Sequence, residues 1–449
     1  MGGILSLNNH KPILTAANGA SQSDTRKRRR ISASFWEEDP PWLIPNLPDE
    51  ISFQILARLP RAFYLKAKLV SRGWKSAIMS PELYKTRKEL GTTEEWLYVL
   101  TKLNDDMLLW YALDPVSGKW QRLPPVHGFP TKDCAPKTIK ITDAVRRLFR
   151  KKEPLDHIPF CGCAIGAIDG SLYVMGGFCR DSTMRCVWRY DPIKNVWDEI
   201  SPMSVGRAYC KTGILNGKLY VVGGVTRDRG GLTPLQSAEV FDPRSGVWTE
   251  IPNMPFAKGH MLPNAFLADF LKPIATGIST YRGKLYVPQS LYCWPFFVDA
   301  GGEVYDPETN RWVEMPIGMG EGWPARQAGS KLSVIVDGEL YALDPSGSTN
   351  AAKIKVYDSQ GDVWKAIEGD VPICDLTDSD SPYLLSGFLG KIHVVTKDGN
   401  QNIVIWQADR HNQPVPSSGT YGFDANIWRL IASKSSGSSE LVSCQLLDI

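Results

Sequence analysis

With 449 residues and a formal net charge of +3, the chain is long enough for more than one domain and too nearly neutral for a general nucleic-acid-binding protein. Its 15 Trp, 16 Tyr, 39 Gly and 32 Pro favour many short strands joined by tight turns. The nine cysteines are scattered without a Cys-x-x-Cys pair, so we expect reduced thiols and neither a metal site nor a cofactor. No apolar run reaches the roughly 18 residues of a membrane span, and we expect a soluble protein of the nucleus, the cytoplasm or both.

Residues 1–39 are rich in Asn, Ser, Ala and Arg and poor in core-forming residues, which predicts a disordered basic tail. The run RKRRR at 26–30 is interpreted either as a solvated segment or as a nuclear import signal. Gly2 and Ser6 also fit the short and permissive pattern of N-myristoylation, but we expect no stable membrane insertion.

Residues 40–90 have a helical pattern. Pro48 followed by Asp49 and Glu50 indicates a helix start, because proline suits the first turn and carboxylates favour the positive end of a helix. Apolar residues then recur at helical spacing as far as Pro60 and again beyond it. About fifty residues of short helices make a marginal core, so the binding of a partner would help to stabilise this segment.

Three motifs in this segment resemble the F-box in their order and spacing: LP-x-EI at 47–51, IL-x-RL at 55–59 and K-x-VS-x-x-W at 68–74. The resemblance implies docking on a Skp-type adaptor and, through it, on a cullin–RING ubiquitin ligase; an ordinary three-helix bundle is the alternative. The residues that the resemblance assigns to adaptor binding are Leu47, Pro48, Ile51, Ile55, Leu56, Leu59, Val70 and Trp74. Some of them must also form the core of the segment, and the sequence does not separate the two roles.

The rest of the chain, 91–449, is an array of degenerate repeats. In five of them an Asp follows an aromatic residue or Leu, and a Trp stands six positions further on. These pairs are Asp114 and Trp120, Asp191 and Trp197, Asp242 and Trp248, Asp306 and Trp312, and Asp358 and Trp364. A sixth unit carries Asp409, with Trp428 displaced by an insertion. A short strand pattern precedes each Asp, so each unit is interpreted as antiparallel strands joined by tight turns.

These units resemble the kelch repeat, and repeats two and three carry double glycines at 176–177 and 223–224. The resemblance implies an all-β six-bladed kelch β-propeller, preceded by the small all-α F-box domain and the disordered tail, in which Tyr and Trp pack between neighbouring blades. Repeat one has no obvious innermost strand. We predict that the strand pattern at about 440–447 pairs into the first blade and closes the ring, which removes exposed sheet edges.

Plant-type F-box/kelch proteins combine these two modules in this order. The resemblance implies a non-catalytic substrate receptor that holds a target protein near the ubiquitin-charged enzyme, and we find no residues arranged for catalysis. Three alternatives stay open: a kelch scaffold that acts outside a ligase, a copper oxidase built on kelch blades, and a nucleic-acid-binding protein. The six His share no repeat position, which disfavours a copper site, and the near-neutral charge disfavours nucleic acid.

Insertions that break the repeat period are candidates for target binding, because loops rather than sheets carry specificity on such a scaffold. In the segment 121–164, the basic residues around Arg146 and Arg150 form either a solvated helix or a docking site for an acidic target. A second insertion, at 289–302, holds aromatic residues that are either buried or anchors for a protein partner. They are Tyr292, Trp294, Phe296 and Phe297.

Two further insertions, 255–278 and 410–426, are weaker candidates. Arg207 and Arg326 each follow a turn that contains Met and Pro, and we expect them either at the rim of the propeller channel or in an inward structural role.

Overall fold

The computed structural model describes most of the chain from Trp42 onward. The described ranges are 42–103, 108–125, 162–179, 182–228, 231–255, 273–293, 296–323, 332–344, 352–367, 371–372, 383–408 and 427–449, with the backbone alone at 179, 228, 291–293 and 296–300. Trp42–Ile449 form one compact unit. The predicted tail, with its basic run and its N-myristoylation pattern, lies outside the described residues. In the described part, no helix is long and apolar enough to cross a membrane.

Short helices come first, and their ends follow the capping signals of the sequence. They are α1 (Asp49–Ala57), the 3-10 helix η1 (Arg61–Phe63), α2 (Tyr64–Ala67), α3 (Arg72–Ile78) and α4 (Pro81–Leu90). Ser71 caps α3, since its hydroxyl accepts a hydrogen bond from the backbone N of Trp74 at 3.0 Å. Gly91 ends α4 with a φ of 63°, a conformation that glycine adopts without a steric penalty. Leu56, Tyr64, Ile78 and Leu83, from α1 to α4, form a common apolar core.

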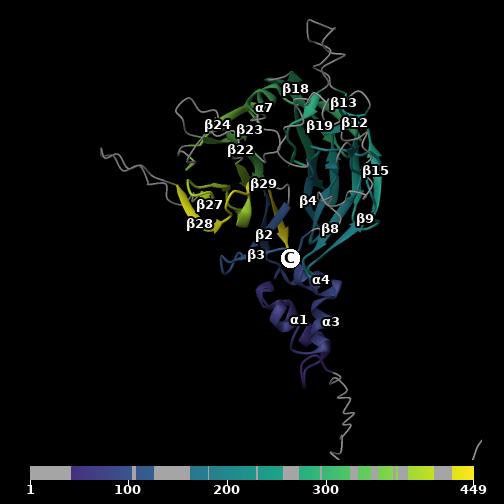
Figure 1. The fold of residues 1–449 in the computed structure, drawn as a ribbon, viewed down its shortest axis with the longest axis vertical. Coiled ribbons are helices and arrows are strands. Elements are labelled where there is room, and N and C mark those ends of the chain that lie inside the picture. Colours follow the sequence, from purple (N-terminus) through teal and green to yellow (C-terminus); the bar gives the residue numbers. More distant parts are fainter. Residues whose placement is uncertain are drawn as a thin grey trace, which may run out of the picture. The chain divides into compact units, whose positions relative to one another are not determined.

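The described strands form six larger antiparallel sheets, the blades of a β-propeller (Figure 1), and two small hairpins. The first three have the strand orders β29-β1-β2-β3, β4-β5-β8-β9 and β10-β11-β14-β15. Their strands are β29 (Glu440–Asp448), β1 (Glu95–Lys102), β2 (Leu108–Leu113), β3 (Trp120–Arg122), β4 (Ala164–Ile168), β5 (Ser171–Met175), β8 (Val187–Asp191), β9 (Val196–Ile200), β10 (Lys211–Leu215), β11 (Lys218–Val222), β14 (Ala238–Asp242) and β15 (Val247–Ile251).

The other three blades have the orders β16-β18-β19-β20, β21-β22-β23-β24 and β25-β26-β27-β28, and in the fourth blade β17 also pairs with β18. Their strands are β16 (Pro273–Ala275), β17 (Ser279–Tyr281), β18 (Lys284–Cys293), β19 (Phe296–Asp306), β20 (Arg311–Glu314), β21 (Ser333–Val336), β22 (Glu339–Asp344), β23 (Lys353–Asp358), β24 (Val363–Ala366), β25 (Leu384–Ser386), β26 (His393–Lys397), β27 (Asn402–Ala408) and β28 (Trp428–Ser435). The predicted fold class, a six-bladed propeller after a helical segment, is confirmed.

The C-terminal strand supplies the innermost strand of the first blade. β29 pairs antiparallel with β1 over the whole of both strands, from Glu95 opposite Asp448 to Lys102 opposite Glu440. The two ends of the propeller sequence therefore share one sheet. Two backbone hydrogen bonds between Glu94 and Ile449, of 2.9 and 3.0 Å, tie the final residue to the chain just before β1.

The repeated Asp and Trp have distinct structural roles. In each of the five units with regular spacing, the Asp carboxylate accepts a hydrogen bond of 2.9 Å from the backbone N two residues later, which holds the tight turn before the outer strand. The matching Trp donates its indole N–H to a carbonyl of the preceding blade or of the segment that leaves it. Trp248, for example, donates to the Ser201 carbonyl at 2.9 Å, and Trp120 donates to Ser433 of the sixth blade at 3.1 Å.

Several elements were not expected from the repeat pattern. Two small hairpins extend the second and third blades, β6 (Phe178–Cys179) with β7 (Ser182–Thr183), and β12 (Val225–Asp228) with β13 (Gly231–Pro234). A helix, α7 (Ile317–Gly322), and a 3-10 helix, η4 (Phe388–Gly390), also lie between strands. The insertion at 289–302, expected as a loop, is mostly paired strand, because β18 and β19 continue as a hairpin in which Tyr292 lies opposite Phe297.

Candidate functional site

The helical segment exposes an unusual amount of apolar surface. Of the fifteen large apolar side chains that are exposed in the described residues, seven lie between positions 42 and 70. They are Trp42, Ile51, Ile55, Phe63, Leu65, Leu69 and Val70. Five of the other eight are valines in or next to the outer strands of the blades. Scattered apolar residues are normal on a protein surface, whereas such a concentration on a few short helices is typical of a protein-binding face.

The eight residues assigned to adaptor binding divide between this exposed face and the core of the helical segment. Ile51 and Ile55, one turn apart on α1, are exposed, as are Pro48 and Val70. Leu56 is fully buried in the helical core. The remaining three, Leu47, Leu59 and Trp74, are half-buried. Trp74 is fixed from within, since its indole N–H donates to the Leu43 carbonyl at 2.7 Å.

Four of the seven exposed apolar residues are not among those assigned to adaptor binding from the sequence: Trp42, Phe63, Leu65 and Leu69. Leu69 is the most exposed of all, with 84% of its surface accessible. It stands at the unspecified position of the motif at 68–74, and Leu65 precedes it by one helical turn. This spacing could have predicted a second apolar face, because Leu65 and Leu69 are offset from Tyr64 and Ala67, which lie in the core.

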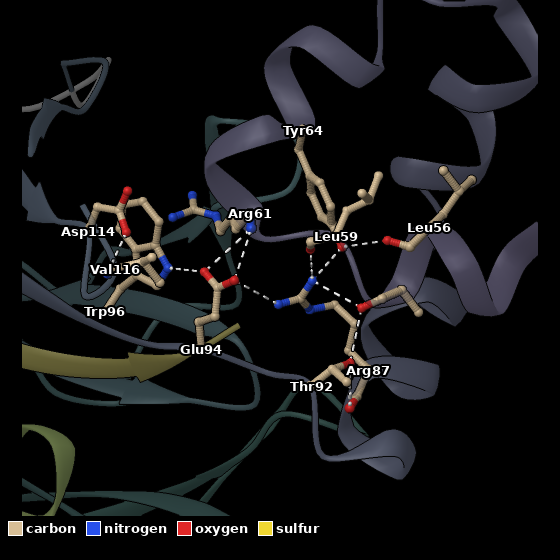
Figure 2. Close-up of polar contacts among 11 residues, drawn as sticks. Leu56, Leu59, Arg61, Tyr64, Arg87, Thr92, Glu94, Trp96, Asp114 and Val116 are labelled. Carbon is tan, nitrogen blue, oxygen red and sulfur yellow. Dashed lines mark hydrogen bonds and ion pairs between the residues drawn. The ribbon is translucent and has the colours of Figure 1, made fainter.

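The helical segment is joined to the propeller by a buried ionic and hydrogen-bonded cluster around Glu94 (Figure 2). The Glu94 carboxylate accepts hydrogen bonds from the backbone N of Arg61 at 3.2 Å and from the indole N of Trp96 at 3.1 Å. It also forms an ion pair with the Arg87 guanidinium of α4, with a nitrogen–oxygen distance of 3.6 Å. One side chain thus connects η1, α4 and β1.

Arg87 extends the cluster into the helical core, where only 2% of its surface is exposed. One guanidinium nitrogen, Nη1, donates to the Leu59 carbonyl at 2.6 Å, to the Tyr64 hydroxyl at 2.7 Å and to the Ala57 carbonyl at 3.2 Å. Figure 2 shows these contacts converging from α4 on the end of α1 and the start of α2. Carbonyls at the end of α1 lack partners within the helix, so a cation there is favourable.

Two further basic side chains reach from the helices to the second blade. Arg61 donates to the Tyr98 hydroxyl at 3.2 Å and to the Pro192 carbonyl at 3.1 Å, and its guanidinium lies 4.6 Å from the centre of the Trp96 ring. Lys68 donates to the Ile193 carbonyl at 2.5 Å. Burial raises the pKa of the Tyr98 hydroxyl, whereas burial and then the neighbouring Arg61 lower the pKa of Lys68. The joint is therefore specific and substantially desolvated.

These contacts show which end of the sheets meets the helices. Ile193 lies in the turn between the third and fourth strands of its blade, and Gly170, against which the Tyr84 ring packs, lies in the turn between the first and second. Antiparallel strands reverse at each turn, so the second-to-third connections and the links between blades lie at the other end. We call that end the distal face. The β6–β7, β12–β13 and outer β18–β19 hairpins belong to it.

Most of the insertions proposed for target binding attach at the distal face. The segments 121–164 and 255–278 link consecutive blades, and 289–302 joins the second strand to the third within the fourth blade. The segment 410–426 differs, since it joins the third and fourth strands of the sixth blade at the end that carries the helices. Arg146, Arg150, Trp294 and Arg326 lie outside the described residues. For Tyr292, Phe296 and Phe297 the backbone alone is described, within β18 and β19.

Arg207 lies inside the propeller rather than at a rim. None of its surface is exposed, and it forms an ion pair of 2.7 Å with Glu239, which is itself 1% exposed. It also donates to the carbonyls of Gly223 and Ser237 at 3.0 and 2.9 Å. These contacts engage both terminal nitrogens of the guanidinium, and the structure places Arg207 inward, which was one of its two interpretations.

The described residues contain no group of three or more His, Cys, Asp or Glu side chains that could hold a metal ion. The described fold is that of a two-module protein, in which a small helical segment with an exposed apolar face is joined to a six-bladed propeller.

Comparison with known proteins places the chain in a family. Residues 44–86 match the F-box domain, and 159–204 and 206–255 match the kelch motif. The F-box/kelch-repeat protein At1g22040 of Arabidopsis thaliana is 57% identical over an alignment of 475 positions that covers 100% of both chains. Another Arabidopsis thaliana protein, the F-box/kelch-repeat protein At1g30090, is 28% identical and is matched over 63% of this chain and 61% of its own. The chain belongs to the plant F-box/kelch-repeat family.

Proposed function

We propose that this chain is the substrate-recognition subunit of a Skp–cullin–F-box ubiquitin ligase. Its F-box docks on a Skp-type adaptor, and its propeller binds the protein that is to be ubiquitinated. The observation that carries the proposal is the exposed apolar face of the F-box helices, in a domain whose core is small and whose apolar residues would otherwise be expected inside.

The joint around Glu94 supports a mechanism of positioning. A receptor accelerates ubiquitin transfer by raising the effective concentration of target lysines near the charged enzyme, and this effect is strongest when the connection between the two binding modules is stiff. The helices contact the propeller through Arg61, Lys68 and the Arg87–Glu94 pair, all of them at least half-buried. Such a receptor needs no nucleophile of its own.

The arrangement also favours the distal face for target capture. There the second, third and fourth blades carry the hairpins β6–β7, β12–β13 and outer β18–β19, one after another around the ring. Contacts between them include a hydrogen bond of 3.1 Å between the hydroxyls of Thr183 and Thr226. A target held at this face leaves the F-box helices free for the adaptor, because the two lie at opposite ends of the sheets.

The test is binding of the purified full chain to a Skp-type adaptor, measured by titration. The variant Ile51→Ser/Leu69→Ser removes two exposed apolar side chains from the F-box, and we expect adaptor binding to weaken at least about tenfold, as is typical for interface anchors. The matched control, Val247→Ser/Val313→Ser, removes two comparably exposed valines from the outer strands and is expected to bind like the unaltered chain.

Both variants change exposed positions, so the fold is expected to survive, and unfolding midpoints check this directly. Equal adaptor affinity for the two variants would contradict the assignment of the docking face. Absence of adaptor binding by the folded, unaltered chain would favour the alternative, a kelch scaffold that acts outside a ligase.

A further inference from the structure

A cavity of about 380 Å³ lies among the innermost strands of the propeller. Residues of β4, β10, β17, β21 and β29 line it, so five of the six blades contribute strands of their inner edge. Its volume falls at the lower end of the range for small-ligand pockets, which is about 300–1,000 Å³. Much of the wall is apolar, with Ile165, Ile278 and Val334 among its residues.

The wall of this cavity is held in place by hydrogen bonds between blades. Gln445 of the first blade donates to the Ile165 carbonyl of the second at 3.2 Å, and Thr212 of the third blade donates to the same carbonyl. Thr280 of the fourth blade donates to the Ile214 carbonyl of the third at 2.7 Å. The hydrogen-bonding capacity of these polar groups is therefore used within the protein, between neighbouring blades. The cavity wall is held in place without a ligand.

Lys211 stands apart from this pattern. It is the one basic residue among the described residues that line the cavity, and none of those residues is an Asp or Glu. In the described part of the chain, no carboxylate forms an ion pair with Lys211 and no side-chain hydrogen bond to its ammonium group is present. Burial lowers the pKa of Lys211 to about 8, so the side chain is still mostly protonated at pH 7. A partly buried cation without a counter-charge is costly unless a ligand supplies one.

The position of Lys211 suits a ligand that enters from the distal face. It is the first residue of β10, and that strand runs from the distal end of the blade toward the turn at Asn216 and Gly217. On a strand, alternate residues share a side, so Lys211 lies on the same side as Gly213. A Cβ at Gly213 would lie 3.0 Å from the side chains of both Ile278 and Leu285, so this side of β10 faces the neighbouring fourth blade, to which the cavity segment 276–280 belongs.

Two hydroxyl groups can complete a site for an oxyanion. Ser279 and Ser333 share a single hydrogen bond of 2.8 Å, which uses one of their two hydroxyl protons and leaves the other to donate. Both serines line the same cavity as Lys211. One ammonium group and one hydroxyl match a singly charged ligand, whereas a phosphate dianion typically requires several cationic or backbone donors.

We propose that the central cavity of the propeller binds a carboxylate group, with Lys211 as its counter-ion and the apolar wall holding the carbon skeleton attached to it. The carboxylate has two possible sources: a small organic acid, or a Glu or Asp side chain of the bound target. The second source rests on the proposed function of the propeller as the recognition module.

The experiment titrates the full chain with benzoate and hexanoate, and with their neutral amides, by ligand-observed NMR. A second arm uses the blocked peptide acetyl-Ala-Ala-Glu-Ala-Ala-amide and its Gln counterpart. Each probe is tested on the unaltered chain, on Lys211→Met and on the control Lys218→Met. Lys218 lies in the adjacent strand, 45% exposed and 3.5 Å from Asp242, so its loss should not affect the cavity.

We expect the acids to bind at least about tenfold more tightly than the amides, and Lys211→Met to lose that preference while Lys218→Met keeps it. Binding of benzoate or hexanoate would identify a small-acid site, and binding of the Glu peptide alone would identify a target side chain. Acids that bind no better than amides, or that bind Lys211→Met equally well, would overturn the proposal.

Folding and function are checked separately. Lys211→Met removes a cation without a counter-charge, so its unfolding midpoint is expected to equal or exceed that of the unaltered chain. Its binding to the Skp-type adaptor should be unchanged, because the F-box lies at the other end of the sheets. Loss of adaptor binding by the unaltered chain would contradict the proposed function and leave the cavity result standing.

Discussion

The joint between the F-box and the propeller can be tested by the substitution Glu94→Gln. Glutamine keeps the length of the side chain and one acceptor oxygen, but it removes the negative charge that pairs with Arg87 at 3.6 Å. Because Arg87 is 2% exposed, the substitution leaves a guanidinium buried without its counter-ion.

The expected cost follows from that burial. Breaking a buried ion pair from one side typically costs about 3–5 kcal/mol. Glu94 keeps 16% of its side chain exposed, and Arg87 retains its bonds to Ala57, Leu59 and Tyr64. We therefore expect about 2–3 kcal/mol, below the full range. The loss falls on the helical segment, because the blades have their own cores.

Hydrogen–deuterium exchange of the full chain measures this loss locally. We expect protected amides in α1 to α4 to exchange roughly 30- to 150-fold faster, while those in the blade strands change little. The control Glu89→Gln removes an exposed pair on the same helix, since Lys85 and Glu89 are 4.0 Å apart with 78% and 64% of their side chains exposed. A surface pair of this kind contributes little, so this variant should exchange like the unaltered chain. The reasoning is refuted if the two variants behave alike, or if faster exchange is spread evenly over the blades.

Three further predictions concern the propeller. Arg207→Met should destabilise the chain by about 3 kcal/mol, because it leaves the Glu239 carboxylate buried without its ion-pair partner. Calorimetry should find a smaller loss of stability in the double variant Arg207→Met/Glu239→Gln. Equal losses in the two variants would argue that the ion pair does not determine this stability. Trp248→Phe keeps an aromatic ring but removes the indole N–H and its hydrogen bond to Ser201. Urea unfolding should therefore show a loss of at least about 1 kcal/mol, and no loss would mean that the bond is unimportant. His393 is fully buried, and burial lowers its pKa to about 4. The folded-state pKa lies below the unfolded value of about 6.5, so on acidification the unfolded chain binds the proton first. The neutral, buried imidazole therefore contributes its full stability above about pH 6.5, and this stability is lost as the pH falls toward 4. Relative to His393→Leu, the unaltered chain should lose about 2 kcal/mol between pH 7 and pH 5, and parallel pH profiles would exclude this role for His393.

The repeat spacing was enough to predict the propeller. An Asp that holds a tight turn and a Trp six residues later recur five times. The structure gives each Asp the same turn bond and each Trp a bond to the preceding blade or to the segment that leaves it. Such local interactions can be predicted from a sequence because the interacting groups are close along the chain or repeat at a fixed interval. The pairing of the C-terminal strand could be predicted for a related reason. The first repeat lacked the innermost strand that the other units have, and the strand pattern at about 440–447 could supply it.

Only the tertiary structure separated docking residues from core residues in the F-box. Leu56 on α1 and Leu69 in the turn after α2 are the same residue type, yet one is fully buried and the other is 84% exposed. Helical periodicity identifies an apolar stripe, but it does not say whether that stripe meets the protein's own core or remains free for a partner. The paired strands at 289–302 were missed for a similar reason, because an aromatic run fits a loop as well as a hairpin.

The sequence by itself determined the two modules, their order and the repeat that builds the blades, because these depend on interactions at short or regular separations. The tertiary structure alone decided which charges are compensated. The Glu94 carboxylate pairs with Arg87 and accepts a hydrogen bond from the backbone N of Arg61, 33 positions away, and Arg207 forms an ion pair with Glu239, 32 positions away. Lys211, in contrast, meets no carboxylate among the described residues that line the cavity. Contacts between residues that are distant along the chain depend on how the blades and helices pack. The pattern of residue types along the chain does not by itself determine that packing.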